Sequence, residues 1–393
     1  MTAKADIECV AFGEGVLAHN RLTAALCALN GIGGFVLNEH LAGQSPQQIA
    51  AHLADLFGIK KNDVEQDVAA LEAEWREASL IVDTEPAGFG EEESQPPVAD
   101  FQCDLTIACN GAPVRLRCEE PYLAGLLQAV AAPAVYPDGG SNAVIDVLYR
   151  NEVYTGWLDG QIKWSCSDRA LARHWALRDT IAASLQAVPP AAIFHASGIS
   201  LGGDGVVMAA LSGSGKTTLA SGLIASGGKL ISDDLLPLCA DGERLAPLPF
   251  ALSVKSGSWP IVGSHFPVLQ DSTVFGNRKL QIRYFWPGEA HAEKNPVPAR
   301  LIVLPRWDRQ AKAETTALSP DEAIALLIET GTRLVASEGA LAAFARFGEN
   351  VPAYSITYPD LDAGIGLVKA LLADLKIRDR PTVEDKVTAT GSG

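Results

Sequence analysis

The stretch that most constrains the fold is residues 205–225, which read GVVMAALSGSGKTTLASGLIA. Its β-branched apolar start predicts a buried strand, its serine- and glycine-rich middle a sharp turn, and its end a helix. This order places backbone N–H groups and a helix N-terminus against a phosphate. The pattern G-x-x-x-x-G-K-[ST] is matched at every fixed position but the first, where Ala210 stands. The sequence therefore favours an α/β unit with a phosphate-binding loop over a turn without a ligand.

The residue types in this loop predict ATP and Mg²⁺ as cofactors. Lys216 is expected to reach the β- and γ-phosphate oxygens and so to serve catalysis as well as binding, while Thr217 is expected to hold the metal ion. The residues predicted to bind the nucleotide are Ser212, Gly213, Ser214, Gly215, Lys216, Thr217 and Thr218.

A second short strand, KLIS, is followed by the adjacent carboxylates Asp233 and Asp234. One carboxylate after a strand suits a magnesium shell, and a second beside it is available to accept a proton from a substrate hydroxyl. The alternative is that both side chains only cap the next turn. The pairing favours phosphoryl transfer to a hydroxyl.

Residues 194–219, FHASGISLGGDGVVMAALSGSGKTTL, followed by the strand that ends in Asp-Asp, resemble the HPr kinase group. The resemblance covers about residues 101–375, with its specific motifs confined to 195–234. It implies that His195 is catalytic, that Asp234 is the general base with His195 as its electrostatic partner, and that Asp233 is on the metal side. A histidine with a purely structural role is the alternative for His195.

Two features depart from the HPr kinases proper. Residues 247–260, PLPFALSVKSGSWP, hold Lys255 and no carboxylate where that group has an acidic magnesium ligand. Residues 275–290, FGNRKLQIRYFWPGEA, replace the HPr-capturing signature and resemble HPr-kinase-related proteins of peptide biosynthesis. Their basic cluster of Arg278, Lys279 and Arg283 is predicted to hold a γ-phosphate or an acidic substrate, with Arg283 as a catalytic residue. A solvated strand face is the alternative.

Residues 18–82 contain helix signals at 31–41, at 45–58 and from 62 onward, where apolar residues recur at helical spacing. The segments ALNGIGGFVLNEHLAGQSPQQIAAHLADLFG and DVEQDVAALEAEWREASLI resemble PqqD, a small winged-helix peptide chaperone, and related leader-recognition domains. The resemblance implies that a precursor's leader peptide binds as an added strand beside the third helix, with residues 19–29 supplying the edge. A winged-helix DNA-binding module is disfavoured, because the segment is acidic and has no Arg/Lys-rich recognition helix.

The predicted organisation is a PqqD-like winged-helix domain (1–82), an acidic flexible linker (83–100), an HPr kinase-like domain (101–378) and a disordered tail (379–393). The kinase-like domain divides into a strand-rich leading region (101–188) and a P-loop core (189–378). In the core, strand and helix patterns alternate, which is typical of an α/β fold.

Composition restricts the partners. A net charge of −16 argues against nucleic-acid binding, and no apolar run reaches the length of a membrane span. The seven cysteines are scattered and never form C-x-x-C, which predicts reduced thiols in a cytoplasmic protein with neither a disulfide framework nor a metal site made by them. A homo-oligomer stays open, because HPr kinases are hexameric.

Together these patterns predict a kinase that transfers the γ-phosphate of ATP to a Ser or Thr hydroxyl of a ribosomally made precursor peptide, recruited through its leader. Two alternatives stay open. One is a kinase of a small molecule or a carrier protein, and the other is a nucleotide-gated peptide scaffold without catalysis.

Overall fold

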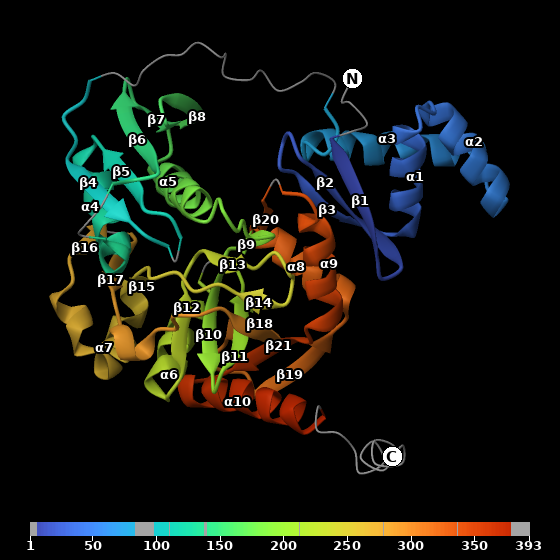
Figure 1. The fold of residues 1–393 in the computed structure, drawn as a ribbon. Coiled ribbons are helices and arrows are strands. Elements are labelled where there is room, and N and C mark those ends of the chain that lie inside the picture. Colours follow the sequence, from blue (N-terminus) through green and yellow to red (C-terminus); the bar gives the residue numbers. More distant parts are fainter. Residues whose placement is uncertain are drawn as a thin grey trace, which may run out of the picture.

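The computed structural model describes residues 6–82, 98–109, 111–136, 140–211, 213–277, 279–335 and 337–378. Most of the predicted linker, residues 83–97, and the whole predicted tail, residues 379–393, lie outside this description, as do Ser212 and Arg278. The described chain mixes helices with several sheets (Figure 1), which confirms the predicted α/β class.

The N-terminal unit is an antiparallel sheet followed by helices. Its elements are β1 (Ile7–Phe12), β2 (Gly15–Asn20), β3 (Leu26–Leu29), α1 (Gly31–Leu41), α2 (Pro46–Phe57) and α3 (Lys61–Glu77), and the strand order is β1-β2-β3. The helices begin at local signals: Asn30 caps α1, and Ser45 and Gln48 form a capping box on α2. The winged-helix assignment stays a prediction.

This sheet is buried on both faces. Ala18 and the buried side chains of the three helices form one core. Phe12, Leu17 and Leu26 belong to another core, shared with Phe344 and Phe347 of α9 (Ala340–Asn350). Apolar burial therefore joins the N-terminal unit to the C-terminal half of the chain, where α8 and α9 lie against it (Figure 1). The predicted domain boundaries stay predictions.

The described residues of the leading region form a five-stranded sheet with helices. Its elements are β4 (Cys103–Ile107), β5 (Val114–Cys118), α4 (Pro121–Ala131), η1 (Ala132–Ala134), β6 (Ala143–Arg150), β7 (Val153–Leu158), β8 (Gln161–Cys166) and α5 (Arg169–Ser184). The strand order is β4-β5-β6-β7-β8, with β5 and β6 parallel. Helix α5 packs against this sheet and leads from it toward the core.

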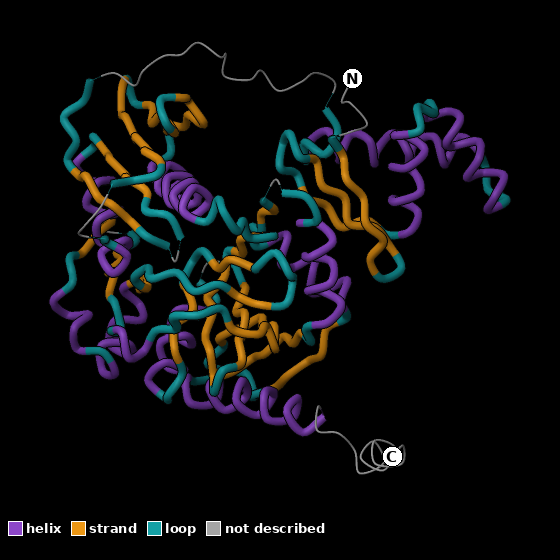
Figure 2. The backbone as a smooth tube through the Cα atoms, in the orientation of Figure 1, coloured by secondary structure: helices purple, strands orange, loops and turns teal. Residues whose placement is uncertain are grey.

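The core is built on a sheet that has ten strands in the described part of the chain. Its elements are β9 (Ala192–Phe194), β10 (Ala196–Leu201), β11 (Asp204–Ala209), α6 (Lys216–Ala225), β12 (Lys229–Ser232), β13 (Leu236–Leu238), β14 (Arg244–Leu245), β18 (Val297–Trp307), β19 (Glu314–Leu318), α8 (Pro320–Glu329), β20 (Arg333–Leu334), α9, β21 (Ala353–Tyr358) and α10 (Leu361–Arg378). Strands β11, β18 and β21 are parallel neighbours, and α6 and α10 pack side by side (Figure 2).

A small sheet in the order β15-β17-β16 lies beside the core and reaches the leading region. Its elements are β15 (Leu252–Lys255), η2 (Ser256–Ser258), α7 (Trp259–His265), η3 (Pro267–Asp271), β16 (Val274–Gly276), β17 (Gln281–Phe285) and η4 (Glu289–His291). The phosphate loop follows β11 and precedes α6, at the carboxyl end of a parallel strand, which is where α/β sheets bind ligands.

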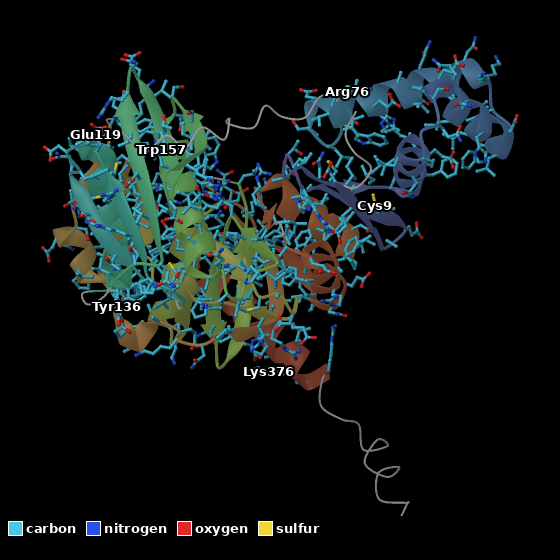
Figure 3. All side chains as sticks on the ribbon, turned by 45° about the horizontal axis from the view of Figure 1, so that its top comes forward. Cys9, Arg76, Glu119, Tyr136, Trp157 and Lys376 are labelled. Carbon is cyan, nitrogen blue, oxygen red and sulfur yellow. The ribbon has the colours of Figure 1, made fainter. Side chains whose placement is uncertain are left out.

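All seven cysteines are free thiols, and Cys9 lies on the N-terminal sheet (Figure 3). Within the described residues, no helix combines the length and the apolar character that crossing a membrane requires.

Phe12→Ala is expected to detach the N-terminal unit once the chain is cut. Phe12 is 3% exposed and lies in the core shared with α9, so truncation removes burial worth ~3–5 kcal/mol. With a protease site placed within residues 83–97, the two wild-type fragments should co-elute in size-exclusion chromatography, whereas the variant's fragments should separate. Phe57→Ala, at an exposed position of α2, is the matched control. Separation of the wild-type fragments would contradict this packing.

Candidate functional site

The predicted phosphate loop lines a small pocket. Gly213 and Gly215 have φ values of +95° and +97°, a left-handed conformation that glycine adopts without steric cost. Between β11 and α6 the chain thus turns sharply around a pocket of about 130 Å³, called here the phosphate pocket. The side chains and backbone around it come from His195, Gly213, Ser214, Gly215, Lys216, Thr217, Thr218, Asp234, Ser253, Val254, Lys255 and Ser258.

Two polar groups in this loop fit an anionic ligand. Ser214 Oγ is buried and has no hydrogen-bond partner among the residues that the structure describes. Lys216 is 8% exposed, its Nζ donates to the carbonyl of Ala210 at 2.9 Å, and burial lowers its pKa. An orphaned hydroxyl and a desolvated cation beside a helix N-terminus suit phosphate oxygens. Ala210 does not have a positive φ, so the alanine in place of the first consensus glycine is not strained there.

Asp234 faces this pocket. It has a φ of +63°, an uncommon conformation for a residue other than glycine, and its side chain is 32% exposed. Its carboxylate lines both the phosphate pocket and a smaller adjoining cavity, called here the inner pocket, which Arg173, His174 and Tyr284 also line. Asp234 Oδ2 lies 3.8 Å from Arg173 Nη2. Backbone strain of this kind clusters at functional sites.

Asp233 has a different environment from its neighbour. Its side chain is buried, and its two oxygens accept hydrogen bonds from Ser197 Oγ at 2.5 Å and from the backbone N–H of Ser253 at 3.0 Å. Burial, and then the charge of Asp234, raise its pKa to about 6. Both oxygens of Asp233 already accept bonds, and Asp233 lines the inner pocket but not the phosphate pocket. Asp234 is therefore the carboxylate that the structure turns toward the phosphate loop. The metal role of Asp233 stays a prediction.

His195 follows β9 directly and lines both pockets. Burial, and then the charge of Lys216, lower its pKa, so its imidazole is neutral near pH 7. His174 of α5 lines the inner pocket, where burial and His195 lower its pKa to about 4. The structure therefore brings His195 together with Lys216 and Asp234, as the sequence predicted, and adds a second neutral histidine.

Arg173 is a site residue that the sequence did not indicate. It projects from α5 of the leading region, and its Nη1 donates to the Tyr284 hydroxyl at 2.5 Å while Nη2 faces Asp234. Burial raises the pKa of Tyr284. The available signal was weak, because Arg173 lies far from the phosphate loop in sequence and belongs to no motif.

The structure does not bring Arg283 to the site. Its Nη1 donates to the carbonyl of Leu269 at 3.1 Å, and its guanidinium lies 4.5 Å from the centre of the Trp259 ring. It lines neither pocket, whereas Tyr284, the next residue of β17, lines the inner pocket. Successive side chains of a strand point to opposite faces, which explains the difference. Lys279 also lies outside both pockets, while Lys255 lines the phosphate pocket.

The groups available to a magnesium ion are few. Thr217 and Asp234 line the phosphate pocket, and the Thr218 hydroxyl donates to Ser258 Oγ at 2.6 Å. The described residues contain no cluster of three or more His, Cys, Asp or Glu side chains that could hold a metal. Magnesium often binds through one or two protein groups together with phosphates, so the Thr217 hydroxyl fits such an ion.

Known proteins match this chain in two ways: a family model matches part of the N-terminal unit, and solved structures match part of the chain. The family described as coenzyme PQQ synthesis protein D (PqqD) matches residues 19–81, which confirms the resemblance predicted for residues 18–82. Among 44 matching chains of solved structures is the Hpr(Ser) kinase/phosphatase from Coxiella burnetii, with 14% identity over 48% of this chain and 99% of that chain. The TM-score of this match is 0.25. No curated protein matches the chain.

Asp233→Asn is expected to change how stability depends on pH. The folded-state pKa, about 6, lies above the ordinary 3.8, so the folded chain binds this proton more tightly than the unfolded chain. The contribution to the free energy of unfolding is therefore fully present below the ordinary pKa and is lost as pH rises through the folded-state pKa. Relative to the variant, the wild type should gain on the order of 2–3 kcal/mol between about pH 7 and pH 4.

Urea unfolding at a series of pH values measures this difference directly. Asp374→Asn, at an exposed position of α10, is the control and should follow the wild type throughout. A difference between wild type and Asp233→Asn that stays constant with pH would show that the carboxyl is not perturbed in this way.

Proposed function

We propose that this protein is an ATP-dependent kinase that transfers the γ-phosphate to a Ser or Thr hydroxyl of a precursor peptide, which the PqqD-like unit recruits by its leader. The observation that carries the proposal is that the phosphate loop and Asp234 line the same pocket. The phosphate loop and the carboxylate of Asp234, itself opposite Arg173, border the same small volume. A phosphate cradle and a proton acceptor at one point are what transfer to a hydroxyl requires.

In this proposal the loop holds the triphosphate of ATP. Backbone N–H groups of residues 213–218 and the orphaned Ser214 hydroxyl bind phosphate oxygens, and Lys216 neutralises their charge. When bound beside Thr217, Mg²⁺ would supply further charge neutralisation at the phosphates. Lys255 lines the same pocket and adds a positive charge where the HPr kinases proper have a carboxylate.

Asp234 acts as the general base. The acceptor hydroxyl oxygen forms a bond to the γ-phosphorus, the bond from that phosphorus to the β,γ-bridging oxygen breaks, and ADP leaves with the electron pair. The hydroxyl proton passes to the carboxylate of Asp234. Arg173 orients that carboxylate, and a neutral His195 does not add a positive charge that would lower its proton affinity. The basic role proposed for an arginine thus moves from Arg283 to Arg173.

The N-terminal unit provides the binding site for the leader of the precursor peptide. Strand β3 is an end strand of its sheet, so its outer edge can pair with an added leader strand beside α3. Because apolar packing joins this unit to α9, a bound leader keeps the rest of the precursor at a high effective concentration near the phosphate pocket. We place this reaction in the cytoplasm, and a homo-oligomer stays an open part of the proposal.

Asp234→Asn is expected to remove general-base catalysis while leaving nucleotide binding in place. The amide keeps the size of the side chain and cannot accept the proton, so transfer should fall by ~10²–10⁴-fold while ATP affinity changes little. The measurement is phosphorylation, with γ-labelled ATP, of a Ser- or Thr-containing precursor peptide that the N-terminal unit binds, together with calorimetric titration of ATP. Asp374→Asn is the charge-matched control.

A rate that stays near the wild-type value in Asp234→Asn would remove the general base from the proposal. If wild-type protein binds both ATP and the peptide without any transfer, the scaffold alternative replaces the kinase. Transfer to a small molecule or a carrier protein, with the peptide unmodified, favours the remaining alternative.

A further inference from the structure

A second and larger cleft lies outside the site described above. It has a volume of about 740 Å³ and is called here the inter-unit cleft. Three parts of the chain line it: residues 22–25 with residues 78–79, which follow α3; strand β8 with helix α5; and residues 333–335 with Ile193. Figure 1 shows β9 and β20 between helix α5 and the N-terminal sheet.

The cleft is bordered by strand ends and edges suited to an extended peptide. Strands β8 and β20 are end strands of their described sheets, and β3 begins directly after Ala25 of the cleft. An end strand offers backbone N–H and C=O groups to an added strand. One wall is aromatic: Trp164 and Trp175 lie with ring centroids 5.4 Å apart, and Trp164 Nε1 is fixed by a 2.9 Å hydrogen bond to Asp179.

The charge of the lining selects the kind of peptide. Lys163, Arg178 and Arg333 contribute to it, and no Asp or Glu is among the described residues that line the cleft. This is a local excess of positive charge in a chain of net charge −16. Arg178 pairs with Asp179 at 2.7 Å, whereas Lys163 and Arg333 are at exposed positions. Complementary charge favours an acidic ligand over a neutral or basic one.

The cleft connects the peptide-recruiting unit to the phosphate pocket. Ile193, which lines the cleft, pairs with Arg333 between strands β9 and β20 and stands two residues before His195. Gly331, two residues before Arg333, lies beside His195: a Cβ added there would be 3.6 Å from the His195 Cβ. The short β9–β20 ladder therefore leads from the cleft to the catalytic histidine.

We propose that the inter-unit cleft binds an extended acidic segment of the precursor peptide, located between its leader and its acceptor hydroxyl. The identity of the occupant rests on the proposed function, whereas the preference for an acidic extended peptide rests on the cleft alone. The cleft thereby selects precursors by charge and guides the acceptor residue along β9 and β20 toward Asp234.

The test uses the full chain and three fluorescein-labelled synthetic peptides of equal length: alternating Glu-Gly, Gln-Gly and Lys-Gly. Saturating ATP and Mg²⁺ keep the phosphate pocket filled during fluorescence-anisotropy titrations. The Glu-Gly peptide should bind at least about tenfold more tightly than the other two, and Lys163→Glu combined with Arg333→Glu should abolish that preference. Lys294→Glu combined with Lys369→Glu makes the same change of net charge elsewhere and should preserve the preference.

The outcomes of this experiment test peptide binding in the inter-unit cleft independently of the kinase reaction. Equal binding of the three peptides, or a charge preference that survives in Lys163→Glu/Arg333→Glu, overturns the proposal. A wild-type chain that is dimeric, does not discriminate among the peptides, and becomes monomeric in that variant identifies a second copy as the occupant and also overturns it. A cleft-dependent acidic preference supports it even when no precursor is phosphorylated, a result that would count against the proposed function alone.

Discussion

The contacts of Arg173 hold the candidate site together. Two adjacent carboxylates, one of them buried, repel each other and are costly to ionise unless their surroundings differ. Here Asp233 accepts bonds from Ser197 and the Ser253 backbone, while Asp234 turns toward Arg173 and the phosphate loop. The arginine also donates to Tyr284 of the small sheet. Elements from the leading region, the core and the small sheet thus meet at one guanidinium.

This interaction makes the leading region part of the site. Helix α5 presents Arg173, His174 and Leu177 to the inner pocket, whereas Trp175 and Arg178 of the same helix line the inter-unit cleft. Residues three or four apart share a face of a helix, so Arg173 with Leu177 and Trp175 with Arg178 lie on two different faces, and one helix borders both spaces. A displacement of α5 would therefore alter the cleft that we assign to the peptide and the carboxylate that we assign to proton transfer.

Local signals predicted the parts of the fold that depend on neighbouring residues. The phosphate loop between β11 and α6 and the capped helices of the N-terminal unit follow from glycine and capping positions. Helix α4 was missed although Glu120 and Pro121 gave a start signal, and α9 begins after Gly339 without a side-chain cap. The seam of Phe12 against α9 depends on contacts distant in sequence, which patterning alone does not specify.

The residues of the candidate site also fall into two groups: those that local motifs predicted and those that only tertiary packing brings to the site. Lys216, Asp234 and His195 were predicted from motif spacing and line one pocket. Arg173, His174 and Tyr284 were missed, because tertiary packing alone brings them there. Arg283, which the sequence predicted as a catalytic residue, stands one position before Tyr284, which lines the inner pocket. A shift of one residue along a strand moves the side chain to the opposite face of the sheet. The unequal surroundings of Asp233 and Asp234 likewise arise from partners on other elements.

A double-mutant cycle between Arg173 and Asp234 tests the central claim most directly. The initial rate of γ-phosphate transfer to the precursor peptide is measured for the wild type, Arg173→Met, Asp234→Asn and the double variant, with thermal unfolding to verify that each is folded. If Arg173 acts by orienting Asp234, each single change slows the rate, and the double variant is no slower than Asp234→Asn alone. Rate losses that multiply independently, or an Arg173→Met variant as fast as the wild type, would contradict the account.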